Sequence, residues 1–64
     1  LDTFRTHMLA ELLVARADAL SMQGRTSEAS AERDRARVLL EAVAPLVEGT
    51  DERRVAELLE WLEG

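Results

Sequence analysis

The chain has little of what enzymes use in their active sites. Its 64 residues include no cysteine, no tyrosine, no lysine and a single histidine, His7. Without cysteine, neither disulfides nor thiolate metal sites can stabilise so small a fold. There is no glycine-rich phosphate loop and no Glu-x-x-His motif. We therefore expect no enzyme activity, no cofactor and no metal, and we expect His7 to be a surface residue.

Positive charge and long apolar runs are also scarce. Thirteen acidic residues against eight arginines give a net charge of −5 and an isoelectric point of about 4.7. This balance argues against nucleic acid or an anionic membrane surface as a partner. No run approaches the roughly 18 apolar residues that a membrane span requires. We expect a soluble, cytoplasmic protein with a protein partner and no small-molecule substrate.

Hydrophobic periodicity predicts an all-α fold, with one domain over residues 1–64. A helical hairpin of residues 3–23 and 27–47 is followed by a short third helix, residues 51–63. Gly24 can take the left-handed conformation that closes a helix, and Thr26 or Ser27 can cap the next one. The chain should therefore reverse direction at this turn.

The end of the second helix is marked by Pro45, which cannot donate a backbone hydrogen bond to the carbonyl of Glu41. The helix either kinks at Pro45 or ends near Val43 with Pro45 opening a short extra turn. We favour the kink, with Gly49 ending the helix and Thr50 capping the third helix. Trp61 is expected to cover the edge of the core with its indole N–H towards water.

Apolar residues of the first helix form two stripes. One comprises Leu9, Leu13, Ala17 and Leu20. The other, which we call the seam, has nearly coiled-coil spacing and comprises Phe4, Met8, Leu12, Ala15, Ala19 and Met22.

The second helix has one apolar stripe, and its early half, residues 30–35, reads as a solvated surface. That single stripe can cover only one of the two stripes of the first helix. We expect the seam to be covered from outside the hairpin, in an oligomer, most simply a homodimer.

A family resemblance begins at the turn. The pattern of large, small and turn residues resembles a tetratricopeptide unit at Leu13, Ala17, Leu20, Gly24, Ala29 and Ala36. The resemblance covers roughly residues 10–43. Arg16 and Arg33 stand where the family usually has a leucine and an aromatic residue, and Glu41 stands where it often has proline.

The resemblance implies a unit cut from a larger protein and followed by a solvating helix. It also implies a concave, partner-binding surface formed by Glu11, Val14, Asp18 and Ser21, which would suit a basic peptide.

Two non-catalytic functions follow from these patterns. The first is a tetratricopeptide-like protein interaction module that works through its concave side. The alternative is a dimerisation or docking bundle of a large multienzyme or regulatory assembly, which would use the seam.

Overall fold

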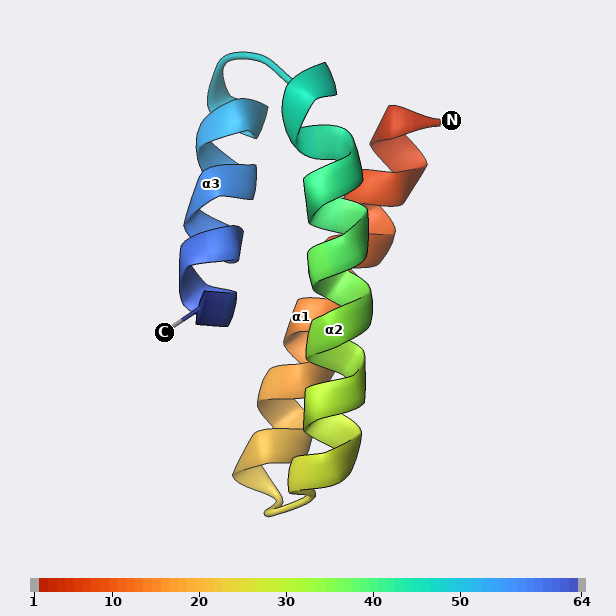
Figure 1. Cartoon of the computed structure of the whole chain (residues 1–64), viewed down its shortest axis with the longest axis vertical. Coiled ribbons are helices and arrows are strands. Elements are labelled where there is room, and N and C mark those ends of the chain that lie inside the picture. The colour runs from red at the N-terminus through yellow and green to blue at the C-terminus, as the bar shows by residue number, and fades with distance from the viewer. Residues whose placement is uncertain (1, 64) are drawn as a thin grey trace.

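The computed structural model describes residues 2–63, and every element of secondary structure in this range is a helix. The elements are α1 (Thr3–Met22), α2 (Thr26–Val43), the short 3-10 helix η1 (Ala44–Leu46) and α3 (Thr50–Glu63). The helices α1 and α2 form an antiparallel hairpin, and α3 runs back beside α2 in the opposite direction (Figure 1). The predicted all-α class and the predicted hairpin with a third helix are confirmed.

A tight glycine turn joins α1 to α2. Gly24 has φ +78°, as predicted. The amide of Arg25 donates to the Leu20 carbonyl at 2.9 Å, and the amide of Gly24 donates to the Ser21 carbonyl at 3.0 Å. These two bonds make a Schellman motif, which uses carbonyls that the end of α1 would otherwise leave unpaired.

The predicted cap of α2 at Thr26 or Ser27 is wrong. The cap position is Arg25, whose carbonyl accepts from the amide of Ala29 at 3.0 Å. The Schellman motif ends at Arg25, so the new helix begins at once and takes Thr26 and Ser27 into its first turn. The side chain of Arg25 makes no cap bond and instead pairs with Glu28 at 2.7 Å.

The connection from α2 to α3 also differs from the favoured prediction. The α-helix ends at Val43, and Pro45 lies at the start of η1 instead of kinking a helix that continues to residue 47. The missing N–H of Pro45 explains this end, because the helix loses its next hydrogen bond there. Gly49, with φ +64°, immediately precedes α3, and its carbonyl accepts from Arg53 at 3.2 Å. Thr50 is therefore the first residue of α3 and not its cap.

The core lies where the three helices meet. Of the stripe Leu9, Leu13, Ala17 and Leu20 on α1, Leu13 belongs to the core and Ala17 is buried beside it, whereas Leu9 is half exposed and Leu20 only partly buried. Ala10 is fully buried but belonged to neither predicted stripe. The core cluster consists of Ala10, Leu13, Ala36, Leu40, Val43, Val47, Val55, Leu58 and Leu62. Small residues at positions 10 and 36 let α1 and α2 approach closely at the centre of the hairpin.

The C-terminal helix α3 is held by side chains of α2 as well as by the core. The guanidinium of Arg37 donates to the Leu62 carbonyl at 3.2 Å, and that of Arg33 lies 4.7 Å from the centre of the Trp61 ring. The first contact satisfies a carbonyl at the end of α3, and the second is a cation–π interaction. Trp61 is 37% exposed, in keeping with a place at the edge of the core.

Candidate protein interface

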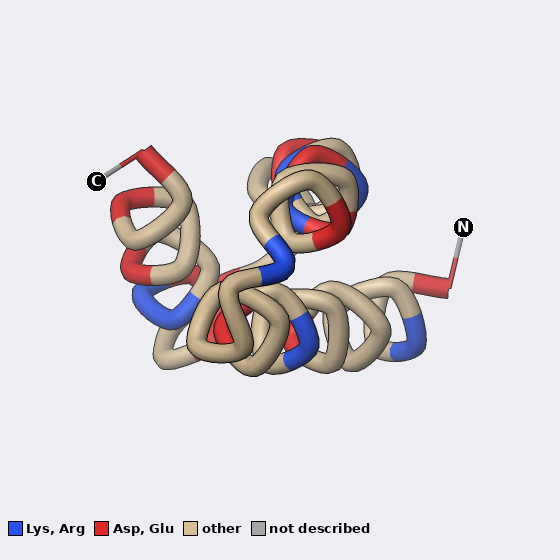
Figure 2. Tube along the Cα trace, turned by 90° about the horizontal axis from the view of Figure 1, so that it is seen from below, with Lys and Arg blue, Asp and Glu red and all other residues tan. Residues whose placement is uncertain are grey.

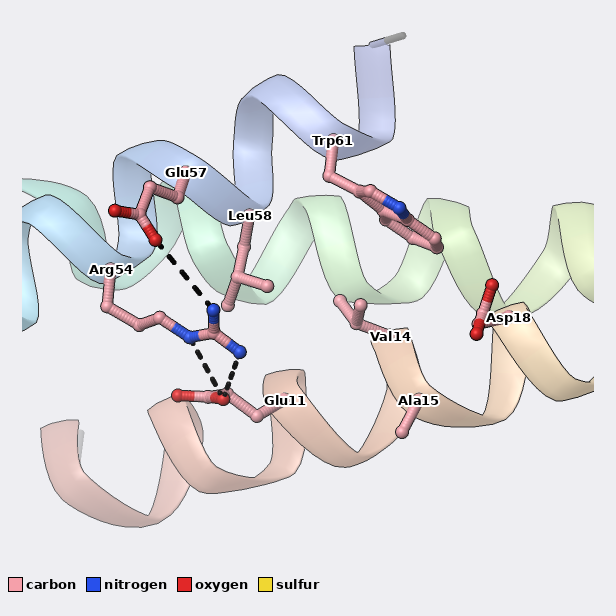
Figure 3. A pocket seen from close by; sticks show the side chains of 8 residues that line it. All are labelled: Glu11, Val14, Ala15, Asp18, Arg54, Glu57, Leu58 and Trp61. Carbon is pink, nitrogen blue, oxygen red and sulfur yellow. Dashed lines mark hydrogen bonds and ion pairs between the residues drawn. The ribbon is translucent and has the colours of Figure 1, made fainter.

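A groove between α1 and α3 contains most of the predicted concave surface. Its volume is about 470 Å³. Glu11, Val14 and Asp18 line it from α1 (Figure 3). Ser21 is exposed but lies outside the groove. Ala15 from α1 and Arg54, Glu57, Leu58 and Trp61 from α3 complete the lining. The structure thus brings together three of the four predicted partner-binding residues and sets a tryptophan opposite them.

Glu11 is already engaged within the chain. One of its carboxylate oxygens accepts from Arg54 Nε at 3.2 Å and from Arg54 Nη2 at 3.0 Å. Arg54 also lies 3.8 Å from a carboxylate oxygen of Glu57 (Figure 3). The hydrogen bonds from Arg54 lower the pKa of Glu11 below its ordinary value of 4.5, and the same pairing raises the pKa of Arg54. This ion pair links α1 to α3. The role that the structure shows for Glu11 is therefore to join the two walls of the groove.

His7 is not the surface residue that we expected. It is only 8% exposed, and its Nε2 atom lies 2.9 Å from the second carboxylate oxygen of Glu11. The expectation failed because His7 borders a hollow that is shared with Leu46 and Val47 of the connection between α2 and α3. Periodicity alone assigned His7 to a polar side and could not place this connection beside α1. His7 and Arg54 therefore meet the same carboxylate from two directions. Asp18, two turns further along, has no ion pair among the described residues.

The early half of α2 is less solvated than we predicted, because Glu32 is buried. Its side chain is 9% exposed, and its carboxylate lies 3.6 Å from Arg16 and 3.4 Å from Arg35. Burying a carboxylate is costly unless opposite charges and hydrogen bonds accompany it. Arg16, which departs from the tetratricopeptide pattern, supplies one of these charges. The positive charge of Arg16 thus offsets the buried negative charge of Glu32.

The outer face of α1, which carries the seam, is an apolar surface that the single chain leaves uncovered. It lies opposite the core-facing residues Ala10, Leu13 and Ala17 on the helical wheel. All six seam residues are exposed, and Phe4 and Met22 reach 73% and 82%. Charged residues are widely spaced along α1 and crowded along α2 (Figure 2). A contiguous apolar face of this kind is typical of a protein interaction site.

Two other kinds of site find no support within residues 2–63. There is no group of three or more histidine, cysteine, aspartate or glutamate side chains placed to hold a metal ion. Nor does any helix in that range have the length and apolar character needed to cross a membrane.

The protein is a small helical hairpin with a third helix packed against it, and it exposes one apolar face of α1. Comparison of the chain with protein families, with curated proteins and with solved structures gives no match. The tetratricopeptide resemblance is therefore carried only by the residues quoted above and by the hairpin they form.

Sequence reasoning missed three features of the structure, which are the burial of Ala10, the ion pair of Arg54 and the burial of Glu32. Ala10 had a usable signal, since it precedes Leu13 and Ala17 at the i, i+3, i+7 spacing of a helix face. Arg54 had none, because it meets Glu11 across 43 positions of sequence. The burial of Glu32 likewise depends on how closely α1 approaches α2.

Proposed function

We propose that the chain is a non-catalytic protein–protein interaction module that binds through the outer face of α1. The observation that carries this proposal is the exposure of the whole seam, whereas the other apolar stripe of α1 buries Leu13 and Ala17. Exposing side chains as large as Phe4, Met8 and Leu12 forgoes about 1.5 to 3 kcal/mol for each one that a partner could fully bury. A domain of this size has only a small net stability. A protein surface that covers the seam would recover part of that energy.

A matched pair of variants tests the proposal. Leu12→Glu places a charge in the middle of the seam, and Val38→Glu makes the same change at a residue of α2 that is 65% exposed. Both should keep the far-ultraviolet circular dichroism spectrum of the wild type, because neither side chain belongs to the core cluster. Leu12→Glu should lose bound protein partners in an affinity capture, and Val38→Glu should retain them. Equal capture by all three chains would contradict the proposal.

The α1–α3 groove supports a second candidate function, recognition of a basic peptide by a tetratricopeptide-like unit. The carboxylates of Asp18 and Glu57 and the ring of Trp61 would meet a cationic side chain there. Because Arg54 already holds Glu11, we assign the attraction mainly to Asp18. Asp18→Arg should weaken binding of an arginine-rich peptide, whereas Asp34→Arg, the same change on α2, should not. If both variants bind the peptide like the wild type, the groove is not its site.

A further inference from the structure

We infer that the partner covering the seam is a second copy of this chain, and that the two α1 helices pair in parallel and in register. This inference rests on the proposed function, because it names the occupant of the same face. It follows from the character of the residues on the two edges of the seam.

The seam spacing fixes a heptad register along α1. Leu12 and Ala19 take the a positions, and Met8, Ala15 and Met22 take the d positions. Arg5 would be the preceding a residue, but its guanidinium lies 3.4 Å from Asp2. The paired segment therefore runs from Met8 to Met22, with Phe4 beside its first turn.

The two edges of this segment differ in charge. The g positions are Phe4, Glu11 and Asp18, and the e positions are Leu9, Arg16 and Gln23. One edge is thus acidic, and the other carries an arginine. The charges on the e and g positions decide the partner and the orientation of a coiled coil.

A parallel pair places each g residue near the e residue five positions later in the other chain. Phe4 then meets Leu9, and Asp18 meets Gln23. Glu11 lies near Arg16, with Arg54 and Glu32 as their respective partners within each chain. Each contact joins residues of compatible kind, apolar with apolar, acid with base, and acid with amide. The seam is in this sense complementary to itself.

An antiparallel pair would bring like edges together. Glu11 and Asp18 of one helix would then face the same acidic edge of the other, which is unfavourable in a partly desolvated interface. Arg54 offsets the charge of Glu11 within its own chain, but Asp18 has no ion pair among the described residues. Asp18 therefore contributes most to the choice of the parallel orientation.

The rest of the fold allows this pairing. The seam faces away from α2, so two copies can meet without opening either core. Over Thr3–Met22 the two acidic residues balance the two arginines, while the chain as a whole carries −5. The acidic excess lies outside α1, so the helix that would form the contact has no net charge opposing self-association.

Single cysteines give a direct test, because the chain has none of its own. Met8→Cys and Met22→Cys are mixed at equal, high micromolar concentration and oxidised. Tryptic peptides that end at Arg16 and Arg25 then separate the possible links by mass. The parallel pair predicts disulfides from 8 to 8 and from 22 to 22, with the mixed link at the level of a Ser30→Cys control on α2.

Two results would overturn the inference. A dominant link between residues 8 and 22 would show an antiparallel pair, and no link above the control would show that the seam does not self-associate. If links are absent while Leu12→Glu, unlike Val38→Glu, still loses a protein partner, only the self-association fails. If both the links and that difference are absent, the proposed function fails as well.

Discussion

Replacing Gly24 measures the free energy that a left-handed backbone conformation at the hairpin turn costs a residue with a Cβ atom. This cost can be separated from the effects of side-chain packing. A Cβ atom added at Gly24 would meet no atom within 4 Å, so in Gly24→Val the site has open space around the first side-chain atom. The residue has φ +78°, where a residue with a Cβ atom loses about 1 to 2 kcal/mol, and valine should lie at the upper end. The variant should therefore be destabilised by its backbone conformation alone.

The expected effect is large for this chain. At about 0.05 to 0.15 kcal/mol per residue, 64 residues give a stability of roughly 3 to 10 kcal/mol. A loss of 1 kcal/mol lowers the melting temperature of so small a domain by about 4 to 8 °C. Thermal unfolding followed by circular dichroism should show Gly24→Val melting at least several degrees below the wild type.

Two further variants serve as controls for this prediction. Gln23→Val introduces the same side chain one residue earlier, where φ is −86°, and should cost much less. Gly24→Asn should also cost less than Gly24→Val, because asparagine tolerates the left-handed conformation. If Gly24→Val and Gln23→Val melt at the wild-type temperature, the assignment of Gly24 as a left-handed helix cap is wrong.

Three further predictions concern the core, the ion pair and the groove. Leu40→Ala, at a fully buried position, should cost about 2 to 5 kcal/mol in urea unfolding, whereas Leu12→Ala in dilute solution should cost far less; equal losses would contradict the assigned core. Because Arg54 lowers the pKa of Glu11, the ion pair's contribution, at most about 1 kcal/mol, is complete above pH 4.5 and is lost as the pH falls through the lowered pKa. The stability difference between the wild type and Glu11→Gln should shrink over that range, and a constant difference would refute the pairing. Asp18→Arg should leave the melting temperature nearly unchanged, since Asp18 makes no ion pair among the described residues, and a large drop would reveal a structural role.

The sequence predicted the helices and the hairpin turn from local signals, although the predicted caps at Thr26 or Ser27 and at Thr50 are wrong. Gly24 was placed correctly because only glycine adopts a left-handed cap without strain. In α3, Val55, Leu58, Leu59 and Leu62 recur at helical spacing in the sequence, and the structure buries all of them except Leu59, which is partly buried. The existence and order of the three helices follow from such local signals.

Other features were decided by neighbours that are distant in the sequence. The partner of Glu11 is on α3, and the burial of His7 depends on how the helices pack around α1. The end of α2 was a close choice between two outcomes that both follow from Pro45, and sequence alone did not separate them. For the candidate interface, the sequence alone predicted the seam and the polar face of α1 that contains Asp18. The groove beside Asp18 could not be predicted, because its other wall is formed by α3.

The self-association of α1 is tested most directly by sedimentation equilibrium over a wide range of concentration. The average mass of the wild type should rise from the 7.1 kDa of one chain towards twice that value at high micromolar concentration. Val38→Glu should follow the wild type, and Leu12→Glu should stay at the mass of one chain. A wild type that remains at 7.1 kDa throughout, with Met8 and Leu12 methyl groups in NMR contact with α3, would contradict the account.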